Sequence, residues 1–206
     1  MCSRILVTTA ACVGLVIGLW TAGSWYIVRD VQTPDYEVIA NSTEYEVRRY
    51  PRLLLAETRS DKTADADGLF RVLANFIFGD NLGGDEIAMT APVLIASGSA
   101  SFQDGAPATM QFIMPETFTR ATLPTPNDAR VRIREIESRV VAARQFGWFA
   151  GINTQREHKR ALLDTLQRHG VKVVGKPIYA AYQPPFSVPF LKRHEILVEI
   201  EVANGS

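Results

Sequence analysis

The sequence predicts an α+β fold. Two β-β-α-β-β halves form one twisted antiparallel β-barrel or sheet, flanked by two α-helices and preceded by an N-terminal hydrophobic helix. Three observations support this prediction. Residues 5–28 contain no charged side chain, the rest of the chain alternates strand-like and helix-like segments, and the pattern of the first half recurs about 86 to 91 residues later. Such near-constant spacing is typical of an internal duplication.

The apolar segment 5–28 is long enough to cross a bilayer, for which about 20 residues suffice. Its far end carries the aromatic residues that favour a membrane interface, namely Trp20, Trp25 and Tyr26. Arg4 precedes the segment, which favours a single-pass protein of the inner or cell membrane with its soluble domain outside, on the periplasmic side. The alternative is a signal peptide cleaved at the small residues Ala22 and Ser24, which would release a secreted form.

The composition beyond this segment excludes several classes of function. Both cysteines, Cys2 and Cys12, lie within it, so disulfides and thiol catalysis are excluded for the exported part. That part, with roughly 175 residues, fits one domain with a substantial core. Its 21 basic side chains against 22 acidic ones give no footprint for nucleic acid. We expect a linker over 29–35, a single domain over 36–202, and a monomer.

Six segments are expected in the first half. They are two strands within 36–59, a helix over 68–78, a strand over 87–93 that ends near Pro92, a polar connection over 95–108, and a strand over 110–114. The first two strands alternate apolar and polar residues and are separated at Tyr50-Pro51. Asp67 caps the helix, and Gly79 ends it.

A short connector over 123–128 leads to the second half, where the pattern repeats. The expected segments are strands over 131–136 and 140–144, a helix over 154–169, and strands over 178–186 and 195–201. Thr154 and Glu157 form a T-x-x-E capping box at the start of this helix, and Gly170 follows its end. The pseudo-repeats therefore span about 45–114 and 131–200.

The two helices differ in their surfaces. The second is an ordinary amphipathic helix, whereas apolar residues cover roughly 240° of the first, interrupted only by Arg71 and Asn75. Something is therefore expected to cover the side that carries Phe70, Ala74 and Phe78. The alternatives are the loop 183–192, a partner, or a flat apolar ligand held between the helix and that loop.

Several motifs occur in an order that resembles the SOUL family of haem-binding proteins. They are YEVRRYPRLLLAETR (45–59), FGDN (78–81), EIAMTAPV (86–93), FIMPETF (112–118), LPTPND (123–128) and YQPPFSVPFLKRHEILVEI (182–200). The resemblance covers about residues 36–202. It implies a twisted β-barrel flanked by two helices, with haem bound at the first helix and the late proline-rich loop.

A tetrapyrrole suits this region. Its macrocycle is a flat apolar plate that is favourable to bury against Phe and Leu, and its propionates prefer Arg or Lys at the rim. The expected reversible haem or tetrapyrrole site consists of Phe70, Arg71, Ala74, Asn75, Phe78, Phe186, Phe190, Lys192 and Arg193.

Iron ligation is a separate question. His158 and His169 are about 16 Å apart along one helix, too far to share a metal, and are expected to be solvated. His194 stands where the family usually has asparagine, so it is a candidate iron ligand. The alternative for His194 is a hydrogen bond to the backbone, and for Met89 packing is preferred over ligation.

The sequence thus predicts an exported, membrane-tethered haem-binding protein that acts as a carrier, buffer or scavenger. The chain has no Gly-x-Ser-x-Gly, HExxH or CxxC motif, so we expect no enzyme. One alternative is a haem-degrading or redox enzyme. The other is a general module for apolar ligands or proteins, because a two-helix barrel also resembles effector-binding domains of the multidrug-sensing type.

Overall fold

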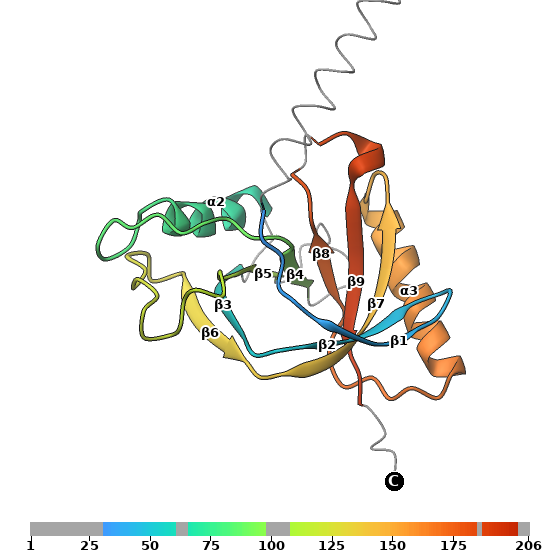
Figure 1. The fold of residues 1–206 in the computed structure, drawn as a ribbon. Helices are drawn as coiled ribbons and strands as arrows, with labels where there is room; N and C mark the ends of the chain where they lie inside the picture. Colours follow the sequence, from blue (N-terminus) through green and yellow to red (C-terminus); the bar gives the residue numbers. More distant parts are fainter. Residues whose placement is uncertain (1–30, 61–65, 98–107, 185–186, 202–206) are drawn as a thin grey trace, which may run out of the picture.

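We analysed a computed structural model that describes residues 31–60, 66–97, 108–184 and 187–201 (Figure 1). The strands are β1 (Glu37–Asn41), β2 (Glu46–Tyr50), β3 (Leu53–Ser60), β4 (Val93–Ser97), β5 (Ala108–Ile113), β6 (Arg132–Ile136), β7 (Arg139–Gly147), β8 (Ile178–Ala181) and β9 (Arg193–Glu199). The helices are α2 (Ala66–Ile77), α3 (Ile152–Arg168) and the short 3₁₀ helix η1 (Pro189–Leu191). The expected anchor over 5–28 and Phe186 lie outside the described residues.

The nine strands form one antiparallel sheet in the order β1-β2-β7-β9-β8-β4-β5-β3-β6. The sheet curls into a half-barrel, with α2 beside one part and α3 beside the other (Figure 1). The structure therefore confirms the predicted curled antiparallel sheet with two helices. Within the described residues, no helix is both long and apolar enough to span a membrane.

Side-chain alternation along the strands explains how the sheet holds two layers of core. Successive side chains of a strand point to opposite faces. On β3, Leu54 and Ala56 pack with α2, whereas Leu53 and Leu55 pack on the other, concave face. On β7, Ala142 packs under α3. Both helices thus cover the same convex face, and a separate apolar cluster lines the concave one.

Three sequence-based predictions for the first half differ from the structure. The segment predicted to hold two strands, 36–59, holds three, because β1 precedes β2 and β3. The predicted strand over 87–93 is wrong, because β4 begins only at Val93, after the cis Ala91–Pro92 bond. Two amides of this segment bond outside the ladder: Ile87 donates to the Ile77 carbonyl and Ala91 to that of Gln32, both at 2.8 Å. The polar connection starts later than predicted, since β4 pairs with β5 through Ser97.

Three boundaries in the second half also differ. Helix α3 begins at Ile152 with Gly151 as N-cap and without a side-chain cap, so the predicted capping box is wrong. Thr154 already lies within the first turn. Strand β8 ends at Ala181, and β9 begins two residues earlier than predicted, at Arg193.

A buried asparagine organises the turn that follows α2. The Asn81 side chain donates to the carbonyls of Phe76 (2.9 Å) and Asp85 (2.8 Å) and accepts from the Asp85 amide (3.1 Å). Gly79 and Gly83 have φ values of 106° and 110°, which disfavour other residues. The FGDN motif therefore fixes the direction in which the chain leaves the helix.

Asn81→Ala is expected to lower the free energy of unfolding by about 2 kcal/mol, because two carbonyls and an amide lose their partner in a buried turn. Urea denaturation measures this loss. Leu82→Ala, at an exposed position of the same turn, is the control and should change stability little. An equal loss in both variants would contradict the role of Asn81.

Candidate functional site

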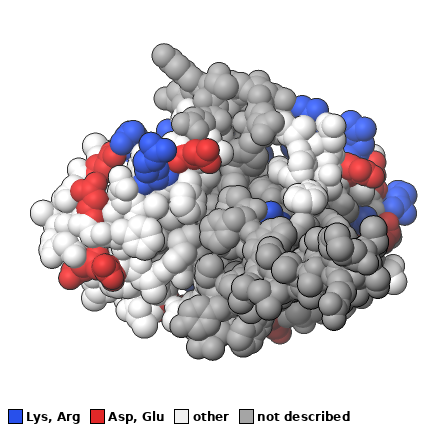
Figure 2. Space-filling model, turned by 90° about the horizontal axis from the view of Figure 1, so that it is seen from above, with Lys and Arg blue, Asp and Glu red and all other residues white. Residues whose placement is uncertain are grey.

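The outer side of α2 and the turn that follows the helix expose large apolar side chains. Phe70 is 42% exposed, Phe78 68% and Leu82 65%, and we call these three residues the α2 patch. Arg71 and Asn75 are exposed on the same helix. Seen from above, the part of the surface on the α2 side is largely uncharged, with charged side chains gathered towards its margin (Figure 2). The described residues of loop 183–192 therefore do not bury Phe70 or Phe78.

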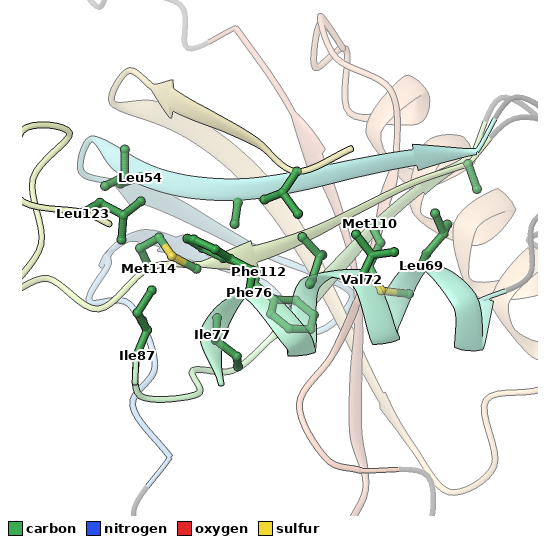
Figure 3. Close-up of a cluster of buried hydrophobic side chains, with 14 residues drawn as sticks. Leu54, Leu69, Val72, Phe76, Ile77, Ile87, Met110, Phe112, Met114 and Leu123 are labelled. Carbon is green, nitrogen blue, oxygen red and sulfur yellow. The ribbon is translucent and has the colours of Figure 1, made fainter. Parts of the chain in front are cut away.

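The inner side of α2 is fully used by the core. Leu69, Val72 and Phe76 point from the helix towards the strands, where they meet Met110 and Phe112 (Figure 3). Ala74 is also buried, unlike the two phenylalanines on either side of it. The Phe70 ring lies edge-on to Phe112, with centroids 5.3 Å apart. The α2 patch is therefore apolar surface in excess of what the fold requires.

The late loop lies elsewhere. Helix η1 packs against β7, whereas α2 packs against β3 and β5. Phe190 is exposed, and the Lys192 ammonium lies 5.6 Å from the centre of the Phe149 ring. The structure thus divides the predicted site residues into one group on α2 and another, comprising Phe190, Lys192 and Arg193, beside β7.

Arg193 belongs to a buried charge cluster that sequence reasoning missed. Glu195 is fully buried on the concave face and accepts two hydrogen bonds from Arg48, at 2.8 and 3.0 Å. Arg193 donates two more, at 2.7 and 3.1 Å, and the Tyr182 hydroxyl donates one at 2.8 Å. Arg193 is therefore committed to Glu195 rather than free to meet a propionate.

The electrostatics of this cluster keep it ionised. Burial acts to raise the pKa of Glu195, but hydrogen bonds and charge from Arg48 and then Arg193 outweigh it and lower the pKa. Burial and the adjacent Glu195 raise the pKa of Tyr182, so its hydroxyl stays protonated and donates. The cluster ties β2 and β9 to Tyr182, the residue that follows β8.

His194 is buried with both ring nitrogens engaged. Its Nε2 lies 3.2 Å from the Trp148 carbonyl, which accepts, and its Nδ1 lies 2.7 Å from the Tyr179 hydroxyl, which then donates. This arrangement supports the backbone-bonded alternative over iron ligation. Met89 packs against the core under α2. In the described part of the chain, no three potential metal ligands come together.

Of the other two histidines, His158 is half-buried, against the expectation that it is solvated, whereas His169 is exposed. His158 stacks on the Phe146 ring, with centroids 4.1 Å apart, and its Nδ1 accepts from Arg144 at 3.3 Å. The Nδ1 of His169 lies 3.1 Å from the Tyr45 hydroxyl. Burial, reinforced by the charge of Arg144, lowers the pKa of His158.

The free energy of unfolding is expected to fall as pH decreases below about 6.5. Burial lowers the pKa of both His158 and His194 in the folded state, so the unfolded chain binds more protons in this range. Chemical denaturation between pH 8 and pH 5 measures the slope. His194→Asn removes one titrating group and should make the profile flatter; an unchanged slope would contradict the role of His194.

A depression of about 370 Å³ lies on the outer face of α3, lined by Asn153, Arg156, Glu157, Arg160, Ala161 and Asp164. Five of these six side chains are polar or charged. An apolar plate would have to strip water from those groups without replacing their hydrogen bonds. The depression therefore does not suit a tetrapyrrole.

Solved structures share this fold at low sequence identity. The C-terminal domain of EcmrR aligns with a TM-score of 0.61 and 10% identity, covering 82% of this chain and 99% of that one. An uncharacterized conserved protein from Listeria innocua aligns with a TM-score of 0.59 at 10% identity, and a hydrolase from the same organism with 0.54 at 12%; each covers 79% of this chain and 94% of its own. These likenesses concern the fold alone.

The comparison with protein families is specific. No curated protein matches the chain significantly. The model of the family described as "SOUL heme-binding protein" matches residues 31–199, which include every described strand and helix. The chain therefore belongs to the SOUL family of haem-binding proteins.

Proposed function

We propose that this protein binds a tetrapyrrole reversibly, as a carrier, buffer or scavenger, with the macrocycle lying on the α2 patch. The observation that carries the proposal is the exposure of Phe70 and Phe78 on a helix whose inner side is already filled. These residues lie two turns apart, about 12 Å along the helix, which suits a flat plate lying along it. Membership of a haem-binding family supports the same ligand class.

The described residues fit the porphyrin better than they fit its metal. The α2 patch offers apolar contacts and an adjacent guanidinium but no histidine, and His194 is committed to Trp148 and Tyr179. Apolar side chains would thus contact the face of the macrocycle, and the guanidinium would contact its edge. Bound haem would bring its iron, and any redox chemistry of that iron, without a ligand from His194. Metal-free porphyrin is expected to bind comparably.

Arg71 is the basic residue of α2 itself and the candidate for a propionate, since Arg193 is occupied by Glu195. Arg71→Ala is expected to weaken binding by at most about 1 kcal/mol, roughly fivefold, because a contact at an exposed rim is screened by water and salt. Haem titrations at low and high ionic strength measure this effect. A loss that does not shrink with added salt would show that Arg71 acts otherwise.

Residues 5–28 are proposed to tether the domain to the membrane, with the domain on the outer side. The uncharged length and the aromatic far end of this segment support the proposal. Full-length protein should then fractionate with membranes and be accessible to protease from outside. A soluble product whose N-terminus lies near Trp25 would favour the cleaved signal instead.

The domain is further proposed to derive from an internal duplication. Without β1, the strand order is β2-β7-β9-β8-β4-β5-β3-β6. If each strand of the first half is exchanged with its counterpart in the second (β2 with β6, β3 with β7, β4 with β8, β5 with β9), the same order results, read from the other end. This symmetry supports the proposal. The halves over 45–114 and 131–200 should then superpose with α2 on α3. The two helices nevertheless differ in their outer sides, and this difference supports a ligand site in the first half.

The proposed function is tested by titrating the full-length protein, in mild detergent, with haem and with metal-free protoporphyrin. Saturable one-to-one changes in absorption or fluorescence are expected for both. Spectra recorded with peroxide or a reductant should show intact haem. Verdohaem or biliverdin bands would indicate a haem-degrading enzyme, and the absence of saturable binding would overturn the proposal in favour of another apolar ligand.

A further inference from the structure

A second exposed apolar surface lies on two neighbouring loops. Trp148 and Phe149 follow β7, and Phe190 and Leu191 belong to η1 before β9; we call these four residues the loop patch. Their exposed fractions are 64, 66, 59 and 41%. Large aromatic side chains are seldom exposed together on a soluble surface unless they meet a partner or a membrane.

The loop patch is held rigidly with its side chains outward. Trp148 has a φ of 67°, which is costly for a bulky residue and persists only where the surroundings impose it. Its carbonyl accepts a hydrogen bond from His194, and Lys192 lies against the Phe149 ring. The Lys192 carbonyl lies beside Gly147, the residue before Trp148, at 3.4 Å from where a Cβ would stand. The two loops therefore form one unit.

The described chain begins at the same end of the sheet. Gln32 bridges to Thr90, just before β4 starts at Val93. Val93 pairs with Ala181 of β8, Ala181 with His194 of β9, and Gly147 of β7 with Arg193. Three strand spacings, about 15 Å, thus separate the start of β4 from the end of β7.

The short chain length between residue 28 and Val31 limits how far this end of the sheet can lie from the proposed membrane segment. Only three residue steps separate position 28 from Val31, and they span at most about 10 Å. If residues 5–28 cross a bilayer, the end of the domain that carries Val31 must lie at its surface. Seen from this end, uncharged surface is present on the side of α3 and η1, with Lys, Arg, Asp and Glu around its margin (Figure 2).

We infer that the loop patch inserts into the interfacial layer of the membrane and orients the tethered domain. This inference rests on the proposed tether. Trp and Phe favour the headgroup region, where their rings are buried among acyl chains and any polar edge stays hydrated. Lys192, next to Leu191, is placed to meet anionic headgroups. The α2 patch, on the other part of the curled sheet, remains available to a ligand.

The test uses full-length protein with Trp20→Phe and Trp25→Phe, so that Trp148 is the only tryptophan left of three. The protein is reconstituted in phosphatidylcholine–phosphatidylglycerol vesicles with or without spin-labelled lipids. The emission maximum of Trp148 should lie at a shorter wavelength than that of a short tryptophan peptide in buffer alone. Its fluorescence should be quenched most strongly by spin labels near the lipid headgroup. Adding Phe149→Ser and Phe190→Ser should abolish that quenching, whereas Val174→Ser, exposed on the α3–β8 connection, should not.

The outcomes separate the two proposals. Protein that floats with vesicles while Trp148 is quenched by aqueous iodide and not by labelled lipid would overturn the docking and leave the tether intact. Protein that does not float would overturn both. Emission that is shielded from iodide and from labelled lipid alike would show a protein, or a second copy, on the patch and would also overturn the inference.

Discussion

Glu195→Ala is expected to lower the free energy of unfolding by about 3–5 kcal/mol. Glu195 is fully buried and is the common acceptor for Arg48, Arg193 and Tyr182. Without it, Glu46 is the one anionic partner that the described residues leave to the buried Arg48 guanidinium. Urea denaturation at neutral pH measures the loss.

Two further variants test the cause. Glu137→Ala breaks the exposed ion pair with Arg52 and should leave stability nearly unchanged. The double variant Arg48→Met, Glu195→Leu removes the buried pair as a whole and should recover much of what Glu195→Ala loses, because apolar residues can replace a buried ion pair. If Glu195→Ala costs no more than Glu137→Ala, the cluster does not hold the sheet as described.

Phe78→Asp is expected to weaken haem binding on the order of 100-fold, with little change in the free energy of unfolding. A carboxylate covered by the macrocycle loses water without gaining a partner, at a cost of about 3 kcal/mol. Without ligand, the exposed position leaves the same carboxylate hydrated. Absorbance titration and urea denaturation of one preparation measure the two quantities.

Ala74→Asp is the matched contrast on the same helix. Ala74 is buried, so the carboxylate would be placed in the core and should destabilise the fold by several kcal/mol. If Phe78→Asp instead unfolds the protein while its folded fraction binds haem normally, Phe78 is a structural residue and the α2 patch is not the ligand surface.

Local patterns in the sequence predicted most elements of the fold. Alternation in YEVRRYPRLLLAETR gave β2 and β3 with the correct break at Pro51, and the apolar stripe of 68–78 gave α2 to within two residues. The error at 87–93 arose because the apolar residues Ile87 and Ala91 are buried without being in a ladder. Burial and strand pairing produce the same pattern in sequence, so only tertiary contacts distinguish them.

The site was predicted less completely, because its contacts join residues that are far apart in the sequence. Arg48 and Tyr50 are two residues apart on β2, so their side chains point to the same, concave face. The carboxylate partner of Arg48, Glu195, is nevertheless 147 residues away in the sequence. The left-handed Trp148 and its bond to His194 likewise leave no local signal. The apolar excess of α2 was visible in the sequence, but the exposure of Phe78 and the burial of Ala74 required the packed structure.

The most direct test is hydrogen–deuterium exchange of the full-length protein with and without saturating haem. If the macrocycle lies on the α2 patch, haem should slow exchange in peptides covering residues 68–82 and leave those covering 187–193 unchanged. Phe78→Asp should remove the protection at the same haem concentration. Protection confined to residues 187–193, or none in either segment under conditions of proven saturation, would contradict the placement of the ligand on α2.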